Sequence, residues 1–567
     1  MTHSTATVSS NPSFMAFYRD GIQWTVREDC MFVVQEKLFD LLHHHEQHPE
    51  LTLVRENNVR ASFFMDAPEE GGRHFFIKRY KVRGWQDVAK YVFLPLKAAS
   101  EWRNLRLLDD CGLPVPRPIA VGIKKSGIVL KDSCLIVEAL LNTQPLNEYV
   151  AEHLPLFTSE KTRDLKQSLA IALARLVADI HSKRIFYRDL HAGNILIRTE
   201  NDGKHQLFLI DLHRAWRPFK LLQWMRMRDL AQLGNSLIEI SSERRLFIKE
   251  YLNATGYTKE SFETFSNKLE NMALRLEARR IKSRSKRCIV SSTTFEVYKG
   301  LYEQYFGRRD FGRLASSRVL EAHAHQMERR QTGIIKQSEN SIITTHGKNS
   351  NLRCAVCVKH YFYRGLKYVL KSMAIKSRAL KSWIAGNGLL VRGISTPLPL
   401  ALAEKKFGPF IYESFLITEW LPDARELNDY IAFLHKQAES TDDKIKFIQS
   451  LAATIRNLHE KGIYHADLKS TNILVRVEGP GRWSFHFIDL ERVKFKKKLT
   501  FRERANNLAQ INASTASCMT AKDRLKFFFF YAKGTQLFGE RKRYYKEILK
   551  ISRTKNTEPF GVIFRST

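Results

Sequence analysis

Apolar residues recur along the chain with two different periods, and both periods appear in the same order in each half. Short segments rich in β-branched and aromatic residues come first, such as 60–65 (RASFFM), 74–80 (HFFIKRY) and 133–140 (SCLIVEAL). Segments of this kind predict strands of an antiparallel sheet. Longer stretches with helical spacing follow, and the clearest is 162–183. The order predicts an α+β fold: a small sheet lobe followed by a larger helical lobe.

Each predicted lobe is interrupted once by the other kind of element. Residues 96–112 have helical spacing inside the sheet lobe and end at Gly112, before a proline-rich turn. Two short apolar stretches, 194–197 (NILI) and 207–212 (LFLIDL), interrupt the helical lobe. If these two strands pair, polar residues at their ends come to the same edge.

The whole order occurs twice. At a spacing of 278 positions the chain repeats Asp189 as Asp467, Asn194 as Asn472, and Asp211 as Asp489. At a spacing of 281 it repeats Lys78 as Lys359, Trp102 as Trp383, and Glu138 as Glu419. One length change of three residues between about 140 and 180 accounts for both spacings. Such recurrence predicts two tandem copies of one domain.

A chain of 567 residues is long enough for two hydrophobic cores. We expect a flexible N-terminus at 1–20, a first domain at 21–285, a connecting segment at 286–330 and a second domain at 331–567.

The repeated polar residues have the chemistry of phosphoryl transfer. Asn194 and Asp211 supply hard oxygen ligands suited to Mg²⁺, and Asp189 is then free to orient or deprotonate a hydroxyl group. A strand lysine, Lys78, followed by a helix acid, Glu101, is the arrangement that holds the α- and β-phosphates of ATP.

The spacing of these residues resembles that of a known superfamily. YRDLHAGN (187–194) followed by LIDL (209–212) resembles the protein-kinase-like superfamily in the form used by sugar and small-molecule kinases. The segments 74–88 and 98–108 look like those of the lipopolysaccharide core kinases, which phosphorylate heptose or 3-deoxy-octulosonic acid of the inner core. The second half, with CVKHYFYRG (357–365) and HADLKSTN (465–472), is similar to the same family.

The resemblance implies a role for each repeated residue. In the first copy, Lys78 and Glu101 match the ATP lysine and the helix glutamate, Asp189 the catalytic base, and Asn194 and Asp211 the Mg²⁺ ligands. Glu138 matches the hinge that binds adenine through its backbone. The implied cofactors are ATP and Mg²⁺.

The second copy matches at all but one of these positions. Its counterparts are Lys359, Asp467, Asn472, Asp489 and Glu419. Ser382 stands where the first copy has Glu101, so Lys359 would be a less well-held phosphate ligand unless another acid, such as Glu404, substitutes. A degenerate kinase or a scaffold is the alternative for this copy.

Two features disfavour a protein kinase, which is the second enzyme hypothesis. Asp229 follows Asp211 by only 18 positions, without the Ala-Pro-Glu element that ends the longer peptide-binding segment of protein kinases. Neither half has a G-x-G-x-x-G ahead of its lysine.

A net charge of +33 indicates an anionic partner. A nucleic-acid-binding or scaffold protein on a kinase-like fold is the alternative of another class, but nucleic acid is the less favoured partner. Lipid A carrying its first core sugars is an anionic acceptor that fits the resemblance. No apolar run approaches the ~18 residues of a spanning helix, and the first twenty residues lack a secretory apolar core. We therefore expect a cytoplasmic protein attached peripherally to the anionic cytoplasmic face of the inner membrane.

Overall fold

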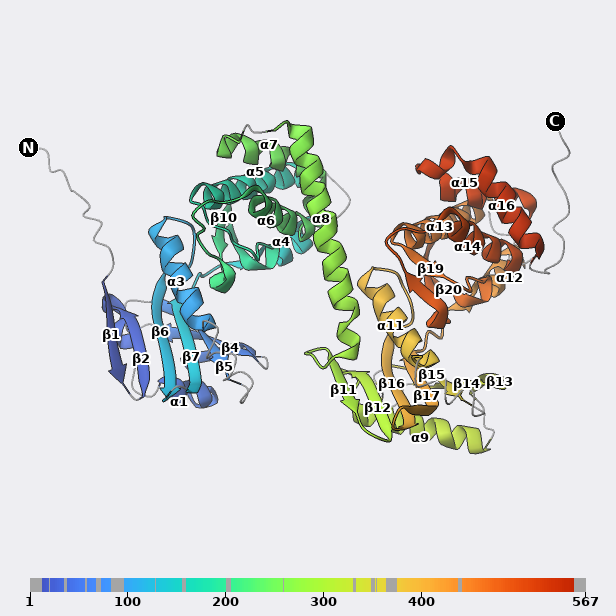
Figure 1. The fold of residues 1–567 in the computed structure, drawn as a ribbon, viewed down its shortest axis with the longest axis horizontal. Coiled ribbons are helices and arrows are strands. Elements are labelled where there is room, and N and C mark those ends of the chain that lie inside the picture. Colours follow the sequence, from blue (N-terminus) through green and yellow to red (C-terminus); the bar gives the residue numbers. More distant parts are fainter. Residues whose placement is uncertain are drawn as a thin grey trace, which may run out of the picture. The chain divides into compact units, whose positions relative to one another are not determined.

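The structure is a computed structural model of the chain. It describes residues 13–19, 21–34, 38–56, 59–67, 73–82, 96–127, 129–154, 160–199, 205–257, 260–329, 333–347, 352, 354–363, 375–436, 441–515 and 517–554. The chain divides into two compact units, Met1–Arg279 and Arg280–Thr567, each of which contains a sheet and a group of helices (Figure 1). Each unit is described separately below.

The sheet of the first unit is antiparallel throughout. In chain order its strands are β1 (Phe14–Arg19), β2 (Ile22–Arg27), β3 (Leu51–Glu56), β4 (Arg60–Ala67), β5 (Arg73–Lys81), β6 (Pro118–Ser126) and β7 (Val129–Glu138). In space their order is β1-β2-β6-β7-β5-β4-β3. The predicted strands at 60–65, 74–80 and 133–140 correspond to β4, β5 and β7, so this part of the prediction is confirmed.

The alternation of side chains along β5 decides which of them face the helix that interrupts the sheet lobe. Phe75 and Ile77 are buried in the core on one face of the sheet. Tyr80 belongs to the core on the opposite face, together with Trp102 of α3 (Lys97–Asp110). Because successive side chains of a strand point to opposite faces, Lys78 lies on the same face as Tyr80, toward α3.

The helical part of the first unit surrounds a small sheet. Its helices are α4 (Leu146–His153), α5 (Glu160–Ser182), α6 (Gln223–Asn235), α7 (Arg244–Thr255) and α8 (Phe262–Ser285); the short α1 (Leu38–His43) precedes β3. The small sheet has the order β10-β9-β8, with β8 at Gln144–Pro145, β9 at Ile195–Thr199 and β10 at His205–Leu209. Leu169, Leu173, Val177 and Ile180 are buried at helical spacing along α5, which explains the long predicted helix.

The second unit repeats this arrangement. Its large sheet has the order β11-β12-β16-β17-β15-β14-β13, with strands β11 (Phe295–Lys299), β12 (Glu303–Arg308), β13 (Ile334–Ser338), β14 (Ser341–His346), β15 (Val356–Phe362), β16 (Pro399–Phe407) and β17 (Phe410–Glu419). Its helices are α9 (Arg313–Arg329), α11 (Arg378–Val391), α12 (Leu427–Lys436), α13 (Thr441–Glu460), α14 (Phe501–Ser514), α15 (Ala521–Ala532) and α16 (Arg541–Thr554). The short strands are β18 (Arg425–Glu426), β19 (Ile463–His465), β20 (Ile473–Gly479), β21 (Arg482–Phe487) and β22 (Val493–Phe495). The predicted α+β fold of two tandem domains, each with a sheet lobe and a helical lobe, is thereby confirmed.

Two of the expected boundaries are wrong. Within 1–20, where a flexible terminus was expected, Phe14–Arg19 form β1 and pair with β2; residues 1–12 and 20 lie outside the described residues. The expected connector at 286–330 contains β11, β12 and α9, and β12 pairs with β16. It therefore belongs to the second sheet, since Tyr305 and Phe306 of β12 are buried there. Polar residues lie beside the few apolar residues of β11 and β12, so neither segment stands out as apolar in the sequence.

Among the helices of the described residues, none is both long and apolar enough to cross a bilayer.

Candidate active site

The loop that carries Asp189 is closed by Asn194. The Asn194 side-chain amide donates a hydrogen bond to the carbonyl oxygen of Asp189 (3.0 Å). The strands on either side pair as expected, with Ile195 opposite Leu209, and the Ile210 N–H donates to the Asn194 carbonyl oxygen (3.0 Å). Asn194 and Asp211 are thus brought to the same edge of the small sheet.

Asp211 lies two residues after the end of β10, in the left-handed backbone region, with φ of 62°. One carboxylate oxygen lies 2.7 Å from Nδ1 of His213, and the other lies 3.6 Å from the Arg60 guanidinium. Burial alone would raise the pKa of Asp211, but the hydrogen bond to His213 and the charges of Lys78 and Arg60 lower that pKa well below its usual range. The carboxylate is therefore ionised at neutral pH.

Lys78 and Glu101 form a buried ion pair that links β5 to α3. The Lys78 Nζ lies 2.6 Å from a Glu101 carboxylate oxygen. The hydroxyl of Tyr80 donates to the other oxygen of the same carboxylate. Glu101 is only 1% exposed, so removing either partner would leave a buried charge without compensation.

The Asp189 carboxylate is held by two side chains from outside its own loop. The Gln232 side-chain amide, on α6, donates to one oxygen (2.8 Å), and the Arg214 guanidinium lies 3.5 Å from the other. The backbone before Asp189 is fixed by buried Asp229, which accepts the N–H groups of Tyr187 and Arg188, each at 2.9 Å. The Asp189 carboxylate is therefore held in one orientation by residues outside its loop.

Glu138 ends β7 and does not join this cluster through its side chain. Its carboxylate is half-exposed and lies 3.7 Å from Arg117. Its N–H donates to the Arg117 carbonyl oxygen (3.0 Å), which fixes the end of the strand.

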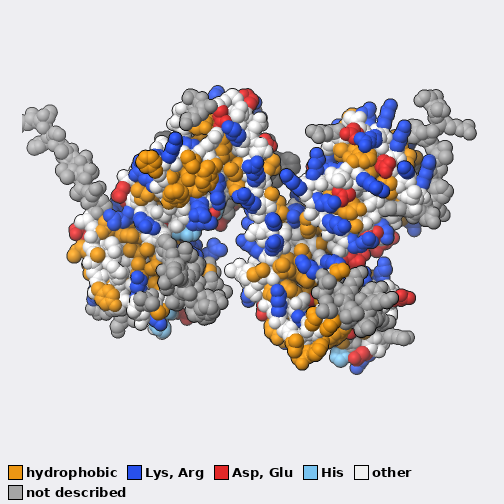
Figure 2. Space-filling model, in the orientation of Figure 1, with side chains coloured by type: hydrophobic (Ala, Val, Ile, Leu, Met, Phe, Trp, Pro, Cys, Tyr) orange, Lys and Arg blue, Asp and Glu red, His pale blue; other side chains and the backbone are white. Residues whose placement is uncertain are grey.

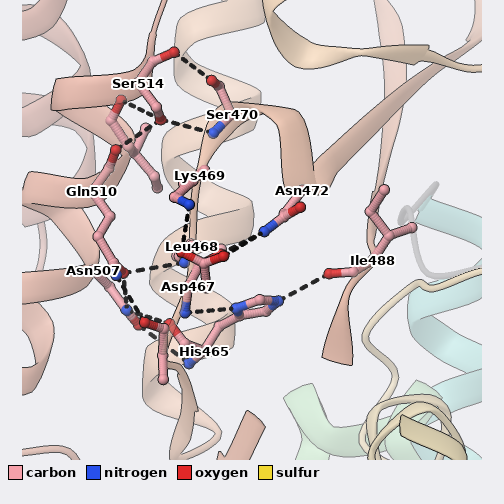
Figure 3. Close-up of polar contacts among 12 residues, drawn as sticks. His465, Asp467, Leu468, Lys469, Ser470, Asn472, Ile488, Asn507, Gln510 and Ser514 are labelled. Carbon is pink, nitrogen blue, oxygen red and sulfur yellow. Dashed lines mark hydrogen bonds and ion pairs between the residues drawn. The ribbon is translucent and has the colours of Figure 1, made fainter. Parts of the chain in front are cut away.

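The second unit repeats the loop around Asp467 (Figure 3). The Asn472 amide donates to the Asp467 carbonyl oxygen (2.8 Å), and the Ile488 N–H donates to the carbonyl oxygen of Asn472 (3.0 Å). Asp489 again has a positive φ, at 58°. Asp467 has a different neighbour, because Lys469 Nζ lies 3.1 Å from its carboxylate.

The partner of the strand lysine differs between the units. Lys359 pairs with Asp489 at 2.7 Å, and Ser382, at the position of Glu101, is buried in α11. Burial acts to raise the pKa of Asp489, but the charge and hydrogen bond of Lys359, together with nearby His465 and Arg378, lower that pKa. Glu404 accepts hydrogen bonds from Ser377 and Gln304 instead, so the suggestion that it replaces the helix acid is wrong.

Another ion pair fixes α11 in the second unit. The Arg378 guanidinium, in the first turn of α11, contacts both carboxylate oxygens of Glu491, at 2.6 and 3.1 Å. Glu491 lies two residues after Asp489, where the first unit has His213. The helix is therefore tied to the segment after Asp489 and not to the strand lysine.

A cavity of about 580 Å³ lies between the sheet and the helices of the second unit. Lys359, Glu419, Asn472 and Asp489 all line it, so four of the five candidate residues of this copy surround one space. Its size is within the range of small-molecule and cofactor sites.

Comparison with known proteins decides the family. Residues 45–253 and 324–531 each match the lipopolysaccharide kinase (Kdo/WaaP) family. The chain belongs to this family. The two matched ranges correspond to the two structural units, so the family domain occurs twice in the chain.

Relatives within the family have two different named substrates. A lipopolysaccharide core heptose(I) kinase, WaaP, of Pseudomonas aeruginosa is 30% identical over 190 residues, which are 31% of this chain and 68% of the relative. WaaP of Escherichia coli K12 is 27% identical over 39% of this chain and 84% of the relative. A 3-deoxy-D-manno-octulosonic acid kinase of Mannheimia succiniciproducens is 26% identical over 34% of this chain and 76% of the relative. A solved structure of WaaP in complex with acyl carrier protein is 23% identical, covers 43% of this chain and 98% of that chain, and superposes with a TM-score of 0.31.

Sequence reasoning missed the side chains that surround the predicted residues of this family domain. Gln232 and Arg214 hold Asp189, and Tyr80 holds Glu101. None of the three was predicted as a site residue. For Gln232 a signal existed, since it recurs 278 positions later as Gln510 within the repeated stretch LAQ.

Proposed function

We propose that the chain is an ATP-dependent kinase that phosphorylates a sugar hydroxyl, of heptose or 3-deoxy-octulosonic acid, in the lipopolysaccharide inner core. The observation that carries the proposal is the buried Lys78–Glu101 ion pair in a domain of this family, close enough to Asp211 for the Lys78 charge to act on that carboxylate. We propose that the first unit performs the transfer.

The contacts of each residue support the role that we propose for it. Lys78, held by Glu101, binds the α- and β-phosphates of ATP, and the backbone at Glu138 binds adenine. Asn194 and the ionised Asp211 would hold Mg²⁺, because both residues lie at the same end of the paired strands β9 and β10 and their oxygens suit a hard cation whose remaining ligands are phosphate and water oxygens. When bound, Mg²⁺ neutralises the charge that develops on the transferred group.

Asp189 is the base in this proposal. A sugar hydroxyl oriented by Asp189 attacks the γ-phosphorus of ATP and loses its proton to the carboxylate, while the bond to ADP breaks. Gln232 and Arg214 hold the carboxylate in one orientation for this proton transfer. They are therefore positioning residues.

The charge of the chain supports an anionic acceptor. Lys and Arg side chains far outnumber Asp and Glu side chains on the face shown in Figure 2, in keeping with the net charge of +33. Core-bearing lipid A is the acceptor that combines anionic charge with the sugars named for the relatives. We propose that the protein works at the cytoplasmic face of the inner membrane, where each cation near the surface contributes about 1 kcal/mol.

We propose that the second unit binds a nucleotide and contributes little to transfer. Lys359 and Glu419 would contact the nucleotide, while Asn472 and Asp489 would hold its metal ion and Asp467 would face the acceptor. The Lys359–Asp489 ion pair competes with these roles, because it joins the residue that would bind phosphate to a residue that would bind the metal ion.

Purified full-length protein with Mg-ATP and core-bearing lipid A, casein or RNA in separate reactions tests this function. We expect phosphate transfer to the lipid alone. Asp189→Asn should lower the rate by about 10³-fold, whereas Asp467→Asn should change it less than about twofold. Tight RNA binding without transfer to the lipid would refute the proposal, and loss of a distinct second phosphate in Asp467→Asn would refute the inactive second unit.

A further inference from the structure

The segment 212–228, directly after Asp211, exposes an unusual number of large apolar side chains. Phe219 is 95% exposed, Trp224 47%, Trp216 44% and Leu222 44%. The same segment contains the cations Arg214, Arg217, Lys220, Arg226 and Arg228 and neither Asp nor Glu. Exposed apolar groups of this size on a monomer indicate a binding surface.

This surface is rigid because its base is hydrogen-bonded and packed. Phe186 and Trp216 exchange backbone hydrogen bonds of 3.0 and 3.1 Å, and the Arg184 guanidinium donates to the Phe219 carbonyl oxygen (3.1 Å). Beneath the exposed side chains, Phe186, Leu221 and Met225 form a small buried cluster. Phe219 and its exposed neighbours are thus displayed on a fixed loop whose anchor, Phe186, is three residues from Asp189.

Tryptophan and phenylalanine interleaved with arginine and lysine form the combination that binds the interface of a bilayer. The aromatic rings enter the region of the headgroups, and the cations interact with anionic lipids around them. We infer that the segment 212–228 docks the first unit on an anionic phospholipid bilayer. This inference rests on the proposed function in one respect, because it explains how Asp189 reaches a sugar anchored in the same membrane.

The matched segment of the second unit, 490–506, has the cations without the exposed apolar groups. Lys494, Lys497 and Lys498 are exposed, whereas Leu499 is buried and Phe495 lies within β22 beneath Arg392. None of its large apolar side chains is exposed among the described residues. Docking through this segment is therefore assigned to the first unit, the one to which we assign catalysis.

Phe219→Ala is the sharpest test, since Trp216 and Trp224 both pack on Phe186 and their loss would disturb the loop. Full-length variants are floated with vesicles of phosphatidylethanolamine and phosphatidylglycerol. We expect Phe219→Ala to bind about tenfold more weakly and Lys220→Gln about fivefold more weakly, the latter only on anionic vesicles. The matched control is Phe407→Ala, which removes a side chain that is 60% exposed in the second unit and should leave vesicle binding unchanged.

A soluble acceptor separates docking from catalysis. Phe219→Ala should phosphorylate deacylated core oligosaccharide as fast as the wild type and vesicle-bound acceptor more slowly. If the wild type phosphorylates neither acceptor, the proposed function fails. The flotation assay does not depend on that result and still tests whether the segment 212–228 docks on the bilayer. Unchanged flotation of Phe219→Ala, or an equal loss in Phe407→Ala, would overturn the inference. So would a change of oligomeric state in Phe219→Ala without a change in flotation, because the surface would then be a contact between protein copies.

Discussion

The Nζ atom of Lys359 lies 2.7 Å from a carboxylate oxygen of Asp489, whereas its counterpart Lys78 lies 2.6 Å from Glu101. The same lysine position thus pairs with a helix acid in one unit and with the candidate metal ligand in the other. In the first unit the Asp211 carboxylate instead contacts His213 and Arg60. The two units therefore share a fold and differ in the partner of the strand lysine.

Glu101→Gln should lower transfer to the lipid acceptor by about 10²-fold, because the neutral amide no longer orients the Lys78 ammonium toward the phosphates. The kinetic constants kcat and KM for ATP, measured on purified protein, check this. Ser382→Ala, at the matched position of the second unit, should leave both constants unchanged. Equal losses in the two variants would mean that both units contribute.

Ser382→Glu should strengthen ATP binding to the second unit by about tenfold. A carboxylate at this position of α11 would attract Lys359 away from Asp489, and Tyr361 occupies the place of Tyr80, whose hydroxyl donates to Glu101. Isothermal titration with Mg-ATP in an Asp189→Asn background measures the change. Weaker binding, with an unchanged melting temperature, would show that the Lys359–Asp489 pair already has the arrangement that nucleotide needs.

The repeat made most of the site predictable from sequence. Asp189, Asn194 and Asp211 recur at a fixed spacing, and local strand pairing alone brings the last two to one edge. Partners that arrive from distant elements were not predictable. Nothing near Lys359 in the sequence indicates that it pairs with Asp489, 130 residues away, because this choice depends on how the sheet faces the helices.

The fold was predicted best where apolar periodicity is strong. The alternating segment at 74–80 became β5, but β11 and β12 were assigned to a connector. The burial of β12 depends on pairing with β16, which lies about a hundred residues further along the chain, and β11 pairs only with β12 at the edge of the sheet. An edge strand such as β11 has a weak local signal, since part of its surface remains polar and exposed.

Gln232→Leu should lower kcat about tenfold with little change in KM for ATP. Its amide donates to the Asp189 carboxylate at 2.8 Å and touches none of the proposed nucleotide ligands. The matched control is Gln510→Leu, because the Gln510 amide donates to the Ala466 carbonyl oxygen and does not reach the Asp467 carboxylate. A rise in KM with constant kcat would argue that Gln232 contributes to nucleotide binding and not to orienting the base.

Mild acid should destabilise the second unit because two of its histidines, one on α9 and one on β15, are buried without charge. His323 on α9 and His360 on β15 lie 3.1 Å apart through Nε2 and Nδ1. Burial, aided by a neighbouring histidine and then by the charge of Lys405, lowers the pKa of His323 to about 4 and that of His360 to about 3. Unfolded histidine has a pKa of about 6.5.

Between these pKa values the unfolded chain binds protons that the folded unit does not. The free energy of unfolding is therefore undiminished above about pH 6.5 and falls as the pH drops toward about 4, by at most about 1.4 kcal/mol per pH unit for each histidine. Scanning calorimetry of the full chain across this range measures the fall. The double variant His323→Leu with His360→Phe should show a shallower pH dependence, because it removes both titrating imidazoles. The introduced phenyl ring would keep the packing on Phe415, where the His360 ring now stacks at 4.0 Å. An unaltered slope in a folded double variant would assign the acid sensitivity to other groups, such as buried His459.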